Sequence, residues 1–222
     1  MSTYIISKEV IIFDWDGTLF DSVSTIVRSV QIACEHLGMD VPDAEYVRKG
    51  IGLGETEVCR YLFGDSGVSV ELFWTTYRQI YANFPIVLFD HVEQALAQLK
   101  QAGYRLAVAT NKCAREFERE LKSSAMSGYF ETWICADQSR AKPDPAMLLE
   151  VAKRLDCVPE QMVMVGDTTH DAHAAHSAGA DMLGLTWGVC ARIDLEPCAS
   201  RVFDNIGQLS AFLLAEKEAC KI

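Results

Sequence analysis

The sequence lacks any apolar run long enough to cross a membrane. Its longest apolar stretches, such as Val10 to Phe13 and Ile86 to Phe89, are strand-sized, whereas a membrane-spanning helix requires roughly 20 residues. The first residues also lack a basic segment followed by a long apolar run, so we expect no signal peptide. These absences predict a cytoplasmic protein with no membrane partner.

Basic residues are also scarce. The chain has 20 Lys and Arg against 31 Asp and Glu, a net charge of -11, and no basic cluster that could bind a phosphate backbone. We therefore expect no nucleic-acid partner. The same acidity would repel a small phosphorylated substrate, so an enzyme acting on one would need a metal ion or a local positive group.

Cysteine pairs with the spacing of a zinc or redox site are missing. Eight cysteines are scattered along the chain without a C-x-x-C motif, which argues against both kinds of site. In a reducing cytoplasm we expect free thiols. With 222 residues, of which 50% are hydrophobic and 23% charged, the chain can bury one sizeable core, or one core plus a small inserted domain.

Strand-like runs alternate with helical patterns in most of the chain. The runs cover residues 9–13, 104–109, 133–135 and 162–165, each followed by polar residues, and the helical patterns cover about 91–102, 113–125, 144–155 and 171–178. This alternation predicts an α/β fold with a doubly wound, Rossmann-like parallel sheet. Ligands of such sheets bind beyond the carboxyl ends of the strands.

Residues 22–84 interrupt the alternation, because four helical patterns follow one another without a strand. We predict a catalytic core of residues 1–20 and 86–222 and an inserted all-helical domain of residues 21–85. Trp74 and Tyr77 are expected in the core of this insert. An insert at this position would lie over the carboxyl edge of the sheet and exclude water from a ligand.

The first strand ends in two carboxylates. Asp14 and Asp16 flank Trp15, and residues two apart in an extended chain project the same way. One could act as a nucleophile while the other moves protons. Gly17 suits a tight turn, and Thr18 could donate to an anion. A turn that merely ends a strand explains the same residues.

Asp167 and Asp171 follow the fourth strand-like run and would bring four acids to one edge. Such crowding requires a cation, and an all-oxygen set of ligands suits Mg²⁺. Capping of the next helix is the alternative.

Three further polar residues follow other strand-like runs. Thr110 and Asn111 precede a helix and could bind phosphate oxygens, although helix capping explains them equally well. Lys142 precedes Pro143, which could hold its ammonium toward the same edge, yet an ordinary surface lysine has the same sequence. The convergence of four polar groups at four strand ends favours a site.

These segments resemble the four motifs of the haloacid dehalogenase superfamily: Asp14-Trp15-Asp16-Gly17-Thr18, Thr110-Asn111, Lys142-Pro143, and Gly166-Asp167 through Asp171. The resemblance implies that Asp14 attacks phosphorus and that Asp16 exchanges protons with the leaving group and water. It implies that Mg²⁺ binds the Asp14 carboxylate, the Asp16 carbonyl and Asp167, with Asp171 in support. Thr110 and Lys142 would hold the phosphoryl group. Trp15 departs from the aliphatic residue usual in the family.

The insert resembles the helical cap of the branch that contains phosphoglycolate phosphatase and β-phosphoglucomutase, with Gly52 in the loop that reaches the substrate. The resemblance implies a Mg²⁺-dependent phosphomonoester hydrolase, monomeric or homodimeric, acting on a small phosphorylated metabolite such as phosphoglycolate, a phosphosugar or a nucleotide. Retention of Asp16 argues against dehalogenation. A phosphosugar mutase, a phosphonate-cleaving relative and a non-catalytic binding module are the alternatives.

Overall fold

The core is a six-stranded parallel sheet with the strand order β3-β2-β1-β4-β5-β6. The structure is a computed structural model and describes residues 8–64, 67–124 and 126–219. The strands are β1 (Val10–Phe13), β2 (Arg105–Thr110), β3 (Thr132–Cys135), β4 (Met162–Gly166), β5 (Asp181–Leu185) and β6 (Arg201–Phe203). The strand order reverses at β1, and such reversals are where α/β sheets bind ligands. The predicted α/β sheet is confirmed.

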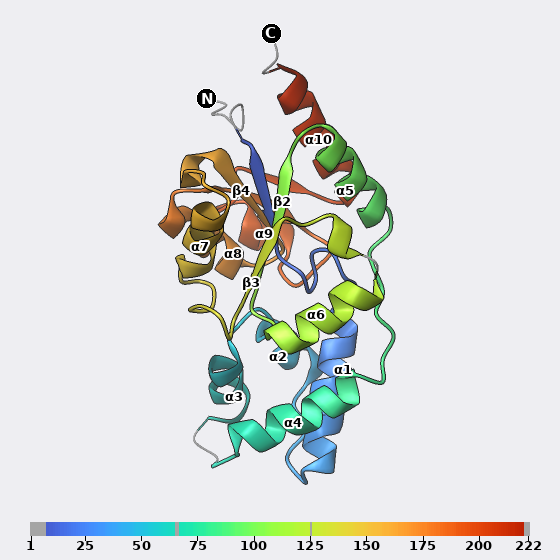
Figure 1. Cartoon of the computed structure of the whole chain (residues 1–222). Coiled ribbons are helices and arrows are strands. Elements are labelled where there is room, and N and C mark those ends of the chain that lie inside the picture. Colours follow the sequence, from blue (N-terminus) through green and yellow to red (C-terminus); the bar gives the residue numbers. More distant parts are fainter. Residues whose placement is uncertain (1–7, 65–66, 125, 220–222) are drawn as a thin grey trace.

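Helices cover both faces of the sheet (Figure 1). They are α5 (Val92–Gln101), α6 (Ala114–Ser123), α7 (Ala146–Arg154), α8 (Thr169–Ala178), α9 (Arg192–Leu195) and α10 (Ile206–Ala219), with short 3-10 turns at Met126–Gly128 and Pro159–Gln161. Alternate β1 side chains point to opposite faces: Ile11 packs with α5, α6 and α10, whereas Ile12 packs with α7 and α8. This explains why all of β1 is apolar and buried.

Among the described residues between β1 and α5 there are four helices: α1 (Val23–His36), α2 (Ala44–Lys49), α3 (Glu55–Phe63) and α4 (Val70–Tyr81). They gather at one end of the molecule in Figure 1 and share a hydrophobic cluster that includes Phe73 and Tyr77. We call these helices and the described loops between them the cap. The chain enters and leaves the cap side by side, because Asp21 N donates to Val87 O at 2.9 Å. The limits 21–85 stay a prediction.

The sequence analysis did not predict two strands, β5 and β6, or one long helix, α10. β5 contains no β-branched residue and includes Gly184, and β6 has only three residues, so neither has the composition and length that mark a strand.

The described residues contain no helix that is both long and apolar enough to cross a membrane. The seven cysteines of the described residues are free thiols, and Cys220 lies outside the described residues.

Candidate active site

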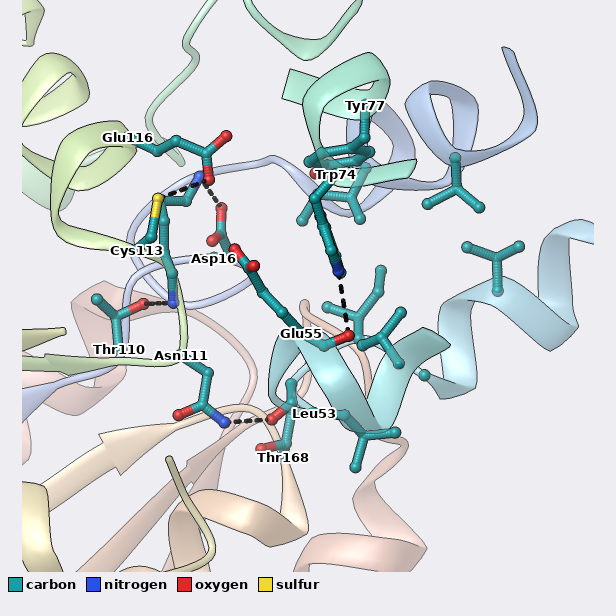
Figure 2. Close-up of a pocket in the computed structure, with 18 of the residues that line it drawn as sticks. Asp16, Leu53, Glu55, Trp74, Tyr77, Thr110, Asn111, Cys113, Glu116 and Thr168 are labelled. Carbon is teal, nitrogen blue, oxygen red and sulfur yellow. Dashed lines mark hydrogen bonds and ion pairs between the residues drawn. The ribbon is translucent and has the colours of Figure 1, made fainter. Parts of the chain in front are cut away.

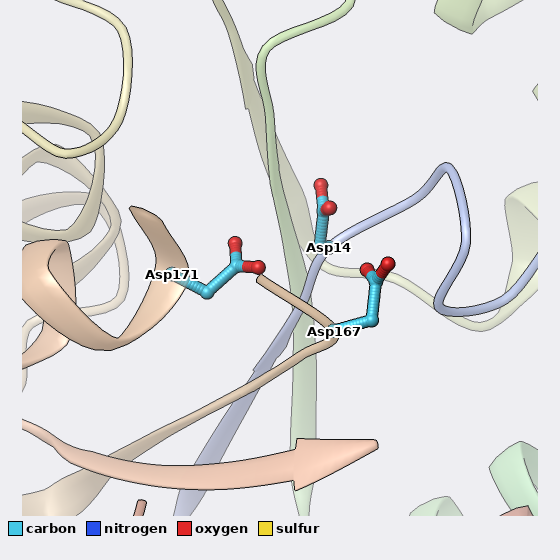
Figure 3. Close-up of side chains that lie close together, drawn as sticks. All are labelled: Asp14, Asp167 and Asp171. Atoms are coloured by element: carbon cyan, nitrogen blue, oxygen red, sulfur yellow. The ribbon is translucent and has the colours of Figure 1, made fainter. Parts of the chain in front are cut away.

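Three buried carboxylates meet at the carboxyl edge of the sheet. Asp14 follows β1, Asp167 follows β4 and Asp171 lies in the first turn of α8. Figure 3 shows the three side chains gathered around one point, and one oxygen from each lies within 4.8 Å of the others. The sequence therefore identified three acids that the fold brings together.

Asp167 is held from two sides by hydrogen bonds and is surrounded by glycine. The Thr18 hydroxyl donates to its Oδ1 at 2.8 Å, and the Val189 backbone N–H donates to its Oδ2 at 2.7 Å. A Cβ atom at Gly17 or Gly188 would overlap this carboxylate. Thr18 is fully buried behind Asp167, so a direct contact between Thr18 and substrate stays a prediction.

Asp171 both caps its helix and pairs with a lysine. Its Oδ2 accepts hydrogen bonds from the backbone N–H (3.0 Å) and the hydroxyl (2.7 Å) of Thr168. Its Oδ1 lies 2.6 Å from the Nζ of Lys142, which also lies 2.8 Å from Asp14 Oδ1. Lys142 is 3% exposed, so its ammonium is a buried bridge between two carboxylates and not a surface charge.

The electrostatics of this group favour a divalent cation. Burial raises the pKa of Asp14 to about 7 even though the Lys142 ammonium opposes the shift. Burial and the neighbouring carboxylates of Asp14 and Asp171 raise the pKa of Asp167 well above its usual range. Burial alone would lower the pKa of Lys142, but the two carboxylates it contacts raise it. Three carboxylates with one ammonium leave an excess of negative charge, and their all-oxygen donors suit Mg²⁺.

Asp16 has a different environment from Asp14. Its Oδ1 lies 3.1 Å from the Nζ of Lys112, which also lies 2.8 Å from Glu120 Oε1. The indole N–H of Trp15 donates to Glu120 Oε2 at 2.7 Å. This buried network explains the unusual tryptophan, whose indole N–H requires a partner. The side chain of Asp16 lies outside the group of three acids, and a metal contact through its carbonyl stays a prediction.

Asn111 connects the cap to the core. Its amide donates to the Gly52 carbonyl at 2.7 Å and to the Lys142 carbonyl at 2.9 Å, and it accepts from the Lys142 backbone N–H at 2.9 Å. The loop containing Gly52 therefore rests on the segment that carries Lys142. Thr110 is buried and its hydroxyl accepts from the backbone N–H of Lys112 at 3.1 Å. Substrate contacts by these residues stay predictions.

A cavity between the cap and the core opens onto these groups. We call it the cap cavity. Asp14, Asp16 and Lys142 line its core side, together with Thr110 and Asn111. Figure 2 shows Trp74, Tyr77 and Glu55 of the cap facing Asp16 across it. Asp167 and Asp171 do not line the cavity, so the three-acid group is entered past Asp14.

Sequence analysis did not assign the network behind Asp16. Lys112 directly follows Thr110 and Asn111, so its position in a polar loop after a strand was a usable signal. Glu120 had no such signal, because it is one of several acidic residues on α6.

The sequence profile of the haloacid dehalogenase-like hydrolases matches residues 11–185. The chain belongs to this family. A phosphoglycolate phosphatase of Colwellia psychrerythraea is 35% identical over 194 residues, covering 82% of this chain and 85% of that protein. The solved structure of CbbY from Rhodobacter sphaeroides in complex with phosphate is similar to this chain, with a TM-score of 0.79 and 25% sequence identity. The match covers 91% of this chain and 96% of the CbbY chain.

The chain is a phosphatase of the haloacid dehalogenase-like family. One of its relatives has a name for another activity: tyrosine-protein kinase PtkA of Mycobacterium tuberculosis is 36% identical over 188 residues, covering 82% of this chain and 63% of PtkA. Because relatives of similar identity are named for different activities, the substrate of this phosphatase must be argued from its own cavity.

Proposed function

We propose that this phosphatase hydrolyses a small phosphate monoester in a Mg²⁺-dependent reaction through an aspartyl phosphate on Asp14. One observation carries the proposal: Asp14 lies at the mouth of the three-acid group, 2.8 Å from the Lys142 ammonium, and faces the cavity that Asp16 also lines. The Asp14 nucleophile, the Lys142 ammonium and the Asp16 carboxylate would then all be within reach of one phosphoryl group in the cavity.

In the first step an oxygen of Asp14 attacks phosphorus and the bond to the leaving oxygen breaks. Asp16 donates a proton to that oxygen, so the alcohol leaves neutral. In the second step Asp16 takes a proton from water, the water oxygen attacks phosphorus, and the bond to Asp14 breaks to release phosphate. Asp14 and Asp16 then return to their starting states.

The other residues neutralise and orient charge. Lys142 would balance the negative charge of the transferring phosphoryl group. Asp14, Asp167 and the backbone carbonyl of Asp16 would hold Mg²⁺, and Asp171 would support the metal shell or keep Lys142 in place. When bound, Mg²⁺ supplies positive charge that offsets the repulsion between Asp14 and the incoming phosphate.

Phosphate release by the purified protein tests this function. Release should require Mg²⁺, stop on chelation, fall below detection in Asp14→Asn, and fall by about 10²–10⁴-fold in Asp16→Asn. Asp40→Asn is the matched control, because Asp40 is exposed on the cap and should keep the wild-type rate. Turnover by Asp14→Asn would overturn the mechanism. A phosphosugar that is isomerised without phosphate release would favour a mutase instead.

A further inference from the structure

We propose that the cap cavity selects phosphate monoesters whose leaving group has an apolar body and no second negative charge. The proposal rests on the proposed function and names the substrate class of that same site. It does not follow from the relatives, one of which is named for phosphoglycolate, a substrate with a carboxylate.

Apart from Glu55, the side chains on the cap side of the cavity are largely apolar. It is lined by aliphatic and aromatic side chains, among them Ile26, Val30, Val47, Val58, Leu62 and Trp74. The Trp74 ring is fixed in place because its indole N–H donates to the Glu55 carbonyl at 3.1 Å (Figure 2). A leaving group bound here would transfer apolar surface out of water onto a preformed wall, which stabilises uncharged groups and not ions.

The charged residues around the cavity are unsuited to a second anion. Four carboxylates line it, those of Asp14, Asp16, Glu55 and Glu116, and two ammonium groups, those of Lys112 and Lys142. Both ammonium groups are already committed. Lys142 contacts Asp14 and Asp171, and Lys112 contacts Asp16 and Glu120.

No basic residue in the described part of the cap lines the cavity and could pair with a second anion. The cap carries five basic residues, Arg28, Arg48, Lys49, Arg60 and Arg78, and none of them lines the cavity. Arg78 pairs with Glu55, and its Nε lies 3.8 Å from Glu116. Arg48 donates to the carbonyls of Gly188 and Val189. A carboxylate on the substrate would meet Glu55 and Glu116 without a partner, and such like-charge contacts are strongly unfavourable.

A matched pair of substrates isolates the charge. Benzyl phosphate and 4-carboxybenzyl phosphate have the same apolar body, and the methylene group insulates the leaving oxygen from the ring substituent. We expect kcat/KM to be at least about tenfold higher for benzyl phosphate, which corresponds to about 1.4 kcal/mol. Phosphoglycolate should be a poorer substrate than ethyl phosphate for the same reason.

Two pairs of variants assign the effect to the cavity. Glu55→Gln removes one carboxylate and weakens the hold on Arg78, so it should narrow the ratio between benzyl and 4-carboxybenzyl phosphate severalfold. Glu71→Gln removes the same charge from an exposed position of α4 and should leave the ratio unchanged. Leu62→Ala should lower the preference for benzyl over methyl phosphate severalfold, whereas Leu72→Ala, at a side chain that is 55% exposed, should not.

The outcomes separate this proposal from the proposed function. If no phosphate ester releases phosphate, the function itself fails. If phosphate is released but 4-carboxybenzyl phosphate or phosphoglycolate reacts as fast as its uncharged partner, the hydrolysis stands and the substrate class is overturned. Equal shifts in Glu55→Gln and Glu71→Gln would also overturn it, because the discrimination would then come from the net charge of the protein.

Discussion

Replacing Lys112 with methionine should strongly destabilise the protein. Lys112 lies between Asp16 and Glu120, and Glu120 is 1% exposed. Methionine keeps most of the volume but leaves the buried Glu120 carboxylate with only Arg119, whose guanidinium lies 3.7 Å away on a side chain that is 42% exposed. Breaking a buried pair in this way costs about 3–5 kcal/mol, which corresponds to about 6–20 °C in Tm for a chain of this size.

A double-mutant cycle in urea, with chelator present, measures the effect. Lys112→Met/Glu120→Gln should be more stable than Lys112→Met, because the introduced glutamine carries no charge and its oxygen can still accept from Trp15. Lys122→Met is the control. Lys122 is exposed on α6, the helix that carries Glu120, so this variant should lose no more than about 0.5 kcal/mol of unfolding free energy.

Acidification gives a second check of the same reasoning. Burial raises the pKa of Glu120 even with the opposing Lys112 ammonium. Without that ammonium the native state should bind a proton more readily than the unfolded state, so the deficit of Lys112→Met should shrink as the pH falls. The assignment of a buried charge network would be refuted if Lys112→Met lost less than about 1 kcal/mol of unfolding free energy relative to the wild type. It would also be refuted if this difference in stability grew on acidification.

Three further outcomes follow from the site. Because the native pKa of Asp14 is about 7 against 3.8 for an ordinary aspartate, the metal-free native state binds the extra proton and loses stability as the pH rises between these values; Mg²⁺ should therefore raise Tm more at about pH 8 than at about pH 5, and an equal shift at both would contradict this. Gly188→Ala places a Cβ against the Asp167 carboxylate and should weaken Mg²⁺ binding by about 10–100-fold in calorimetry, whereas Gly128→Ala, with open space around it, should not. Burial raises the pKa of Cys34 and Cys59 to about 11, so both thiols should resist iodoacetamide in the native protein and react after unfolding, as read by mass spectrometry.

The sheet was predictable where strand composition and loop chemistry agree. Val10–Phe13 is apolar, largely β-branched and followed by an Asp-Gly turn, and it forms one of the two central strands. β5 and α10 were missed because Asp181–Leu185 has no β-branched residue and because the periodicity of Ile206–Ala219 is weak for a helix packed along one side only. In such segments tertiary packing decides the structure more than local preference does.

The convergence of carboxylates was predictable for a topological reason. Parallel strands place their carboxyl ends at one edge, so Asp14 and Asp167 were expected at the same edge once their strands were identified. The pairing of β1 with β4 makes them neighbours. The contacts of Asp16 could not be predicted in this way, because Glu120 is distant in sequence and α6 has acidic residues on several sides. Only the packing of α6 against Trp15 shows which of them is buried.

Detection of the phosphoryl group on Asp14 tests the central claim most directly. The protein is mixed with Mg²⁺ and a phosphate ester that it hydrolyses, and the reaction is quenched in acid during turnover. The protein is then digested and its peptides are mapped by mass spectrometry. We predict one phosphoryl group on the peptide that contains Asp14, removed by hydroxylamine as expected for an acyl phosphate, and accumulating in Asp16→Asn if the loss of the base slows hydrolysis more than the loss of the acid slows transfer. A phosphoryl group on another residue, or turnover by Asp14→Asn, would contradict the account.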